Sequence, residues 1–181
     1  MSIKTTNDPL DQVILVDEND NQIGVMDKVE AHRNPAQLHR ASSVLLRNSK
    51  GEWLIQQRST HKIVGALQWA NTCCGNLRPG ENYEQCARRR LREELNIVGV
   101  ELKEINKFTY QVECNDEFSE HEVDTVFVGQ YEGLISPNPL EVKNTRWIST
   151  QELLSELDKD KPIYAPWTKL VLFTHPEFSK E

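Results

Sequence analysis

The sequence predicts one domain of the α+β class that spans all 181 residues. The length corresponds to about one domain of typical size. Short runs rich in β-branched and other apolar residues, typical of strands, occur in both halves of the chain, and one amphipathic helix lies between them. Strands on both sides of a single helix, with further helices only at the end, favour an α+β arrangement over a doubly wound sheet.

Two hairpins are predicted towards the N-terminus, after a polar segment, residues 1–10, that is expected to be flexible. Two apolar runs joined by a short polar turn are typical of a hairpin. The expected strands pair residues 12–17 with 21–26, and residues 40–47 with 52–58.

The central helix is predicted over residues 81–95. Its apolar stripe consists of Tyr83, Ala87, Leu91 and Leu95, one every four residues. Further strands are expected at residues 102–112, 122–130 and 143–148. A helical region is expected over residues 149–181, with one helix that begins near Ser149, where Glu152 completes the spacing of a capping box, and another over residues 164–174.

The composition limits the classes of function. The formal net charge of −7 argues against general nucleic-acid binding, which needs a basic face, but leaves room for a local basic pocket. No apolar run is long enough to span a membrane, and residues 1–10 lack the apolar core of a secretory signal. The four cysteines, at positions 73, 74, 86 and 114, form no Cys-x-x-Cys pair, so we expect reduced thiols and a cytoplasmic protein.

Three sets of polar residues could carry chemistry. Glu94 lies within about 40° of the apolar stripe of the central helix, so its carboxylate is expected at the edge of the buried face, where a bound cation would stabilise it. Glu120 and Glu122 share one face of a strand, which favours a bound cation or a shared proton, although an exposed strand face would also explain them. Because Pro35 lies between His32 and His39, the two histidines are not expected to stack along one helix.

The loop and helix that follow Cys74 resemble the Nudix box, a loop–helix unit that holds divalent metal and diphosphate. The matching residues are Gly75, Glu81, Arg89, Leu91, Glu93, Glu94 and Ile97. Two positions depart from the hydrolase pattern: Arg90 replaces a glutamate, and Asn96 replaces a glycine. Since a cation at position 90 suits a diphosphate oxygen better than a metal ion, the first departure argues against ordinary Nudix hydrolysis.

The chain from Val13 to Trp167 is similar to the type I isopentenyl diphosphate isomerases, one branch of the Nudix superfamily. The segments that carry the resemblance are Asn71–Gly75, Glu120–Glu122, Lys28 with Ala31-His32, Leu38–Arg40, Tyr110 and Ala165–Trp167. The resemblance implies a Nudix-type mixed β-sheet sandwich flanked by helices. It also implies an isomerase that interconverts isopentenyl and dimethylallyl diphosphate by protonation and deprotonation through a tertiary carbocation.

The resemblance also implies the roles of individual residues. Cys74 and Glu122 are the expected acid–base pair, Tyr110 assists the proton relay, and Trp167, expected to be an exposed indole in a turn, offers its π face to the carbocation. The expected diphosphate-binding cations are Lys28, Arg58, Lys62 and Arg90. The expected ligands of a first divalent metal (Mn²⁺, Mg²⁺ or Zn²⁺) are His32, His39, Asn76, Glu120 and Glu122. Glu94 is expected to contact a second ion, Mg²⁺, that bridges to the diphosphate.

Asn76 is a departure from the isomerase pattern, in which this position is usually a histidine ligand. An amide oxygen suits Mg²⁺ better than Zn²⁺ or Mn²⁺. Two alternatives to an isomerase therefore stay open: a Nudix pyrophosphohydrolase on a diphosphate substrate, and a non-catalytic diphosphate-binding paralogue. In each case the expected partner is a small diphosphate molecule, allylic or homoallylic for the isomerase, and neither a nucleic acid nor a membrane.

Overall fold

A computed structural model describes residues 11–158 and 163–178, so the expected flexible segment 1–10 lies outside the described residues. The strands are β1 (Gln12–Val16), β2 (Gln22–Asp27), β3 (His39–Arg47), β4 (Trp53–Arg58), β5 (Trp69–Ala70), β6 (Cys73–Asn76), β7 (Lys103–Glu113), β8 (Ser119–Gln130) and β9 (Val142–Ile148). The helices are α1 (Lys28–His32), α2 (Tyr83–Leu95), α3 (Thr150–Leu157) and α4 (Thr168–Leu172).

Both predicted hairpins are present. Strands β1 and β2 pair antiparallel along their length. Strands β3 and β4 pair only beside their turn, at Leu46 with Leu54 and at Arg47 with Trp53. Beyond that point they separate, because β3 pairs with the short strand β6 and β4 pairs with β9.

Strand β3 is the centre of a mixed sheet. It runs parallel to β8 from His39 to Arg47, while β7 lies antiparallel on the other edge of β8. β6 lies antiparallel to β3 on the opposite edge. A sheet with one parallel pair among antiparallel pairs confirms the expected mixed sheet.

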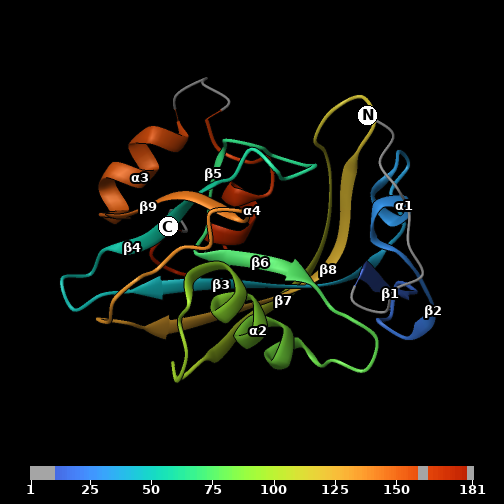
Figure 1. Ribbon diagram of the computed structural model, residues 1–181, viewed down its shortest axis with the longest axis horizontal. Helices are drawn as coiled ribbons and strands as arrows, with labels where there is room; N and C mark the ends of the chain where they lie inside the picture. Colours follow the sequence, from blue (N-terminus) through green and yellow to red (C-terminus); the bar gives the residue numbers. More distant parts are fainter. Residues whose placement is uncertain (1–10, 159–162, 179–181) are drawn as a thin grey trace.

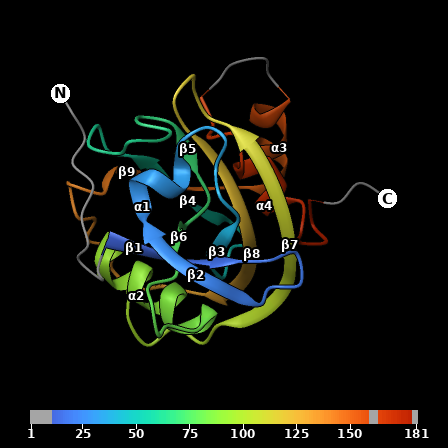
Figure 2. The same cartoon turned by 90° about the vertical axis from the view of Figure 1, so that its right-hand side faces the viewer.

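Helices cover both faces of this sheet (Figures 1 and 2). Val44 and Leu46 of β3 pack with α2, whereas Leu45, which points the other way, packs with α3 and α4. This alternation is what the two-residue period of a strand requires. These two apolar clusters on opposite faces, with a third and smaller cluster that includes Ile14 and Val16 of β1, form the core, in agreement with the expected α+β sandwich.

The predicted helices are present with shifted boundaries. Asn82 caps α2 in a capping box with Gln85, so the helix begins after residue 82. Asn96, which stands at the glycine position of the Nudix box, ends the helix with φ of 55°, a left-handed conformation that asparagine tolerates. Ser149 caps α3 as expected. The last helix is shorter than expected, because Pro166 disfavours helical geometry at the residue before it.

Strands β5 and β6 and helix α1 were not predicted. Each is short: α1 has five residues and β6 has four, too few to show a period. None of the helices in the described part of the chain is long and apolar enough to cross a membrane. All four cysteines are free thiols.

Candidate active site

The described residues enclose a cavity of about 320 Å³ that gathers most of the residues expected in the active site. The expected residues that line it are Lys28, His32, Arg58, Lys62, Cys74, Asn76, Arg90, Tyr110, Glu120, Glu122 and Trp167. His39 and Glu94 do not line it. These lining residues come from α1, β4, the segment after β4, β6, α2, β7, β8 and the turn before α4, so the tertiary structure assembles the cavity.

A cluster of four residues that fits a metal ion lies at the cavity wall, and we call it the metal group: His32, His39, Glu120 and Glu122. All but His39 line the cavity. Each residue offers one ligand atom, and these atoms all lie within 4.8 Å of one another. The pairing of β3 with β8 sets His39 beside Glu122, and Glu120 lies two residues before Glu122 on the same face. Helix α1, which ends at His32, brings the second imidazole. Two imidazoles and two carboxylates at this spacing fit a divalent cation.

Backbone carbonyls orient both imidazoles. His32 Nδ1 lies 2.6 Å from the carbonyl oxygen of Lys28, and His39 Nδ1 lies 2.7 Å from that of Gln37. The Nε2 atoms therefore face the group, as in protein metal sites where the other ring nitrogen donates to a carbonyl. His32 Nε2 lies 3.0 Å from Glu120 Oε2. Burial lowers the pKa of His32, but the Glu120 carboxylate outweighs this effect and leaves that pKa raised.

Asn76 contacts the metal group through its amide nitrogen. Nδ2 donates to Glu122 Oε1 at 2.8 Å and lies 3.0 Å from His39 Nε2. The residue reaches this place because it lies opposite Ala41 in the pairing of β6 with β3. A rotation of the carboxamide would turn its oxygen towards the same atoms, which is the arrangement a ligand would need.

The proposed acid–base residues lie in the same cavity. Tyr110 faces Glu122 across β7 and β8, and its hydroxyl donates to Glu122 Oε2 at 2.5 Å. Burial and the Glu122 carboxylate raise the pKa of Tyr110 well above its usual value, so the phenol keeps its proton. Burial raises the pKa of Cys74 to about 12, although Arg58 opposes this shift. Cys74 is therefore a neutral thiol at neutral pH and can act as a proton donor.

Trp167 is part of the cavity wall, and the expectation of an exposed indole was wrong. Its side chain is 2% exposed and packs in the apolar core, because the turn before α4 folds inward against β5. Arg58 lies over the ring, with Cζ 5.0 Å from the ring centroid. Arg58 is held there by the carbonyl oxygen of Val64, to which it donates through Nε and Nη2.

The wall of the cavity also carries basic residues. The four expected cations, Lys28, Arg58, Lys62 and Arg90, all line it, and we call them the cation group. Partial loss of hydration in the cavity, together with the nearby charges of Lys62 and Arg90, lowers the pKa of Lys28 to about 8. A local basic pocket in an acidic protein agrees with the expectation from the composition.

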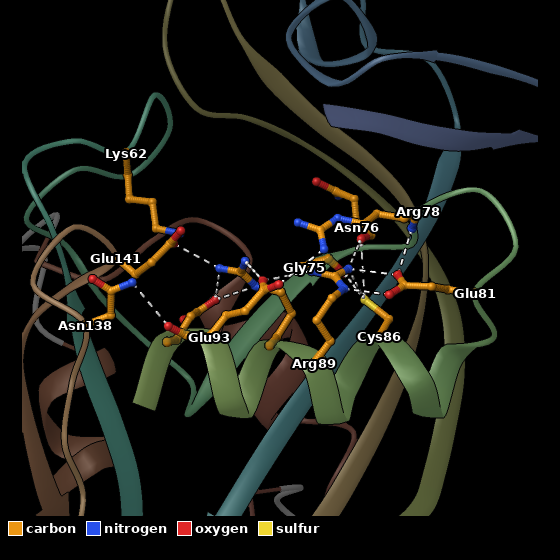
Figure 3. Close-up of polar contacts among 12 residues, drawn as sticks. Lys62, Gly75, Asn76, Arg78, Glu81, Cys86, Arg89, Glu93, Asn138 and Glu141 are labelled. Carbon is orange, nitrogen blue, oxygen red and sulfur yellow. Dashed lines mark hydrogen bonds and ion pairs between the residues drawn. The ribbon is translucent and has the colours of Figure 1, made fainter. Parts of the chain in front are cut away.

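Arg90 reaches the cavity because Gly75, which the arginine side chain contacts, has no side chain that would block it. A Cβ atom at position 75 would lie 2.7 Å from Arg90 Cδ, so only glycine fits the contact between β6 and α2. Arg89, one residue earlier, ties the same two elements together: it donates to Asn76 O at 3.0 Å and pairs with Glu81. Figure 3 shows the contacts of Arg89 with Asn76 and Glu81 along one face of the helix.

Glu94 is placed deeper than expected. Its side chain is fully buried instead of lying at the edge of the buried face, and it does not line the cavity. Glu94 Oε1 accepts from Arg90 Nε at 2.9 Å, and Oε2 accepts from Gln56 Nε2 at 2.5 Å. A protein cation thus occupies the place beside this carboxylate where the sequence suggested a metal ion.

The sequence reasoning missed some residues of the cavity. Glu141 lines it beside Lys62 and Arg90, and Phe118 and His61 also contribute to its walls. No local signal marks Glu141, which precedes an ordinary strand pattern. His61 lies next to an expected cation, but spacing alone assigned it no role.

Comparisons with known proteins agree with this geometry. A family model described as NUDIX domain matches residues 37–171. The isopentenyl-diphosphate Delta-isomerase of Nocardia farcinica is 42% identical, with 88% of this chain and 91% of that protein covered. The protein of the same name from Photobacterium profundum is 41% identical, with 90% and 92% covered.

Solved structures share the fold at low sequence identity. DR0079 from Deinococcus radiodurans matches with a TM-score of 0.76 and 22% identity, over 91% of this chain and 99% of that one. A MutT protein from Methanosarcina mazei matches with a TM-score of 0.62 and 19% identity, over 79% and 96%. These matches show that this chain shares its fold with known three-dimensional structures.

Proposed function

The chain belongs to the NUDIX domain family and, within it, to the isopentenyl-diphosphate Delta-isomerases, and from this membership we propose that it interconverts isopentenyl and dimethylallyl diphosphate. The reaction moves a double bond: one proton is added to the terminal alkene carbon and another is removed two carbons away. The positive charge between the two steps lies on a tertiary carbon. The protein must therefore supply an acid, a base and a dry pocket.

Cys74 and Glu122 are the proposed acid–base pair. Cys74 brings a protonated thiol to the cavity, while Glu122 brings a carboxylate in hydrogen-bond contact with the Tyr110 hydroxyl. Tyr110 would assist the proton relay through its hydrogen bond to Glu122, which also fixes the carboxylate in place. The Trp167 ring forms part of the wall, and its π-system would stabilise the developing cation.

The cation group is the proposed diphosphate site. Lys28, Arg58, Lys62 and Arg90 approach the cavity from different elements, so an anion that spans them would satisfy several charge-assisted hydrogen bonds at once. With the diphosphate on the cation group, the hydrocarbon part of the substrate would lie beside Cys74 and Glu122, which line the same cavity.

The metal group would hold one divalent cation, Mn²⁺, Mg²⁺ or Zn²⁺, with Asn76 as a possible further oxygen ligand. A bound cation would supply positive charge that fixes and polarises the Glu122 carboxylate. A second ion, Mg²⁺, between Glu94 and the diphosphate stays a proposal, and it requires Arg90 to turn from Glu94 towards the substrate. The cytoplasmic location also stays a prediction.

One observation supports this function most strongly: a single cavity joins Cys74 and the Tyr110–Glu122 pair to a set of cations suited to diphosphate. The test is to incubate the protein with isopentenyl diphosphate and Mg²⁺ and to follow the products by NMR. Dimethylallyl diphosphate is the expected product. Release of inorganic phosphate would instead identify a pyrophosphohydrolase, and binding without turnover would identify a diphosphate-binding paralogue.

A further inference from the structure

Glu141 places a carboxylate inside the cation group. It lines the cavity, its Oε2 accepts from Arg90 Nη2 at 2.9 Å, and the same oxygen pairs with Lys62 Nζ. Figure 3 shows Glu141 beside Lys62, above the end of the helix that carries Glu93. Lys62 and Arg90 outweigh the effect of burial and lower the pKa of Glu141 to about 2, so the carboxylate is ionised at neutral pH.

The backbone holds Glu141 in this position from two sides. Asn138 N donates to Glu94 O at 2.8 Å, and Glu141 N donates to Asn138 O at 2.9 Å, which ties the loop to the end of α2. Ser59 N donates to Glu141 O at 3.0 Å, which ties it to the segment after β4. The loop is thus attached to the two elements that carry Arg90 and Lys62. The carboxylate occupies the place between two cations that an incoming phosphate group would need.

We propose that Glu141 is a specificity-determining residue, an internal anion that competes for Lys62 and Arg90 and selects diphosphates over monophosphates. This inference rests on the proposed function, because it assumes that the cation group binds the substrate diphosphate. A monophosphate that displaced the carboxylate would exchange one anion for another and gain little. A diphosphate reaches the remaining cations as well, so its gain exceeds the cost of displacing Glu141. An interaction that every ligand must displace at a cost, and that only the correct ligand repays, is a general route to specificity.

The test compares the binding of inorganic phosphate and inorganic pyrophosphate by calorimetry in buffer that contains Mg²⁺. In Glu141→Gln the amide keeps the size of the side chain and removes its charge. We expect this variant to bind phosphate about tenfold more tightly, and pyrophosphate with a smaller gain, so the preference for pyrophosphate falls. Glu141→Ala serves as a second variant, and urea unfolding checks that both are folded.

Glu93→Gln is the matched control. Glu93 Oε2 also accepts from Arg90, through Nη1 at 2.9 Å, but Glu93 does not line the cavity. The same loss of charge there should leave the preference for pyrophosphate within about twofold of the wild type. Lys62→Ala, which removes one of the two cations, should weaken pyrophosphate binding and so assign that binding to the cavity.

Two results would count against the inference, and they differ from each other. If Glu141→Gln and Glu141→Ala leave the preference unchanged, or weaken both anions, Glu141 orders the cations and does not compete with the substrate. That result overturns the inference and leaves the proposed function intact. If the wild-type protein binds no pyrophosphate, or Lys62→Ala binds it equally well, the cation group is not the diphosphate site, and both proposals fail.

Discussion

Cys74 and Glu122 reach the cavity from strands on opposite edges of β3. Cys74 lies opposite Ser43 in β6, and Glu122 lies beside His39 in β8. A thiol and a carboxylate fixed on separate strands can act on two faces of a small molecule between them. General acid–base catalysis by each would contribute a factor of about 10² to 10⁴ to the rate.

We therefore expect Cys74→Ala and Glu122→Gln each to lower kcat for isomerisation by about 10²-fold or more, because each removes one proton-transfer group. NMR measurement of turnover checks this, with Cys114→Ala as the control, since Cys114 is a half-buried thiol that does not line the cavity. Binding of pyrophosphate should persist in Cys74→Ala. Normal turnover in that variant would contradict the assigned mechanism.

Asn76 is the residue where this chain leaves the isomerase pattern, and its amide touches two members of the metal group. Asn76→His would replace an uncharged oxygen or nitrogen with an imidazole, which borderline metals prefer. We expect tighter binding of Zn²⁺ and Mn²⁺, by about tenfold, and a smaller change for Mg²⁺. Titration calorimetry with each metal measures this.

Asn76→Ala is the control for that experiment, because it removes the amide contacts without adding a ligand. If all metal affinities are the same in Asn76→His and in the wild type, position 76 does not coordinate the metal. If Asn76→His gains isomerase activity that the wild type lacks, the protein is a paralogue that has lost the reaction, and the proposed function fails.

At the scale of elements, the contact of β6 with α2 determines where the cation group lies. Gly75 makes room for Arg90, and Arg89 fastens the end of β6 to the same helix. The contact therefore fixes β6, which carries Cys74 and Asn76, relative to α2, which carries Arg90. A change at the contact should affect both stability and substrate binding.

Gly75→Ala tests this contact. The added methyl group would meet Arg90 Cδ at 2.7 Å, so the guanidinium must leave its pairing with Glu94. We expect the free energy of unfolding to fall by about 1–3 kcal/mol and KM to rise. Urea unfolding and steady-state kinetics measure the two effects. Gly24→Ala is the control, because its nearest neighbour, Leu15 Cδ1, lies 4.0 Å away; an equal loss in both variants would contradict the argument.

At the scale of the whole molecule, the protein is acidic, yet four cations line its cavity, and two of them, Lys62 and Arg90, have carboxylate partners. Arg90 alone pairs with Glu93, Glu94 and Glu141. Such pairs depend on ionised carboxylates, and Glu141 has a pKa lowered to about 2 against an ordinary value of 4.5. A carboxyl group with a lower pKa in the folded state stabilises the fold above its unfolded-state pKa, and this contribution is lost as the pH falls.

We therefore expect the free energy of unfolding to decrease as the pH falls from about 4.5 to about 2. Glu141→Gln should lose on the order of 2 kcal/mol less over this interval, because it has no carboxyl group to protonate there. Urea unfolding at several pH values measures both slopes. Glu104→Gln, at an exposed carboxylate outside the cavity, is the control; identical slopes for wild type and Glu141→Gln would exclude the assigned contribution of Glu141.

The sequence by itself determined the elements whose patterns are local. The stripe on α2 and the polar turns of the two hairpins are set by residues a few positions apart, so the chain alone predicts them. Short motifs that follow one another in the same order as in the isomerase family also indicated the residues of the cavity. The residue types of a motif can be recognised in the sequence before the fold that positions them is known.

Only the tertiary structure decided how those residues meet. Strand β6 exists because β3 pairs with it, and Trp167 is buried because the turn before α4 folds against β5. Glu94 pairs with Arg90, and Glu141 reaches Lys62 from the turn before β9, far along the chain. Several of these contacts join residues that lie far apart in the sequence, so no local periodic pattern predicts them. Their energies depend on burial and on nearby charges, which only the folded chain brings together.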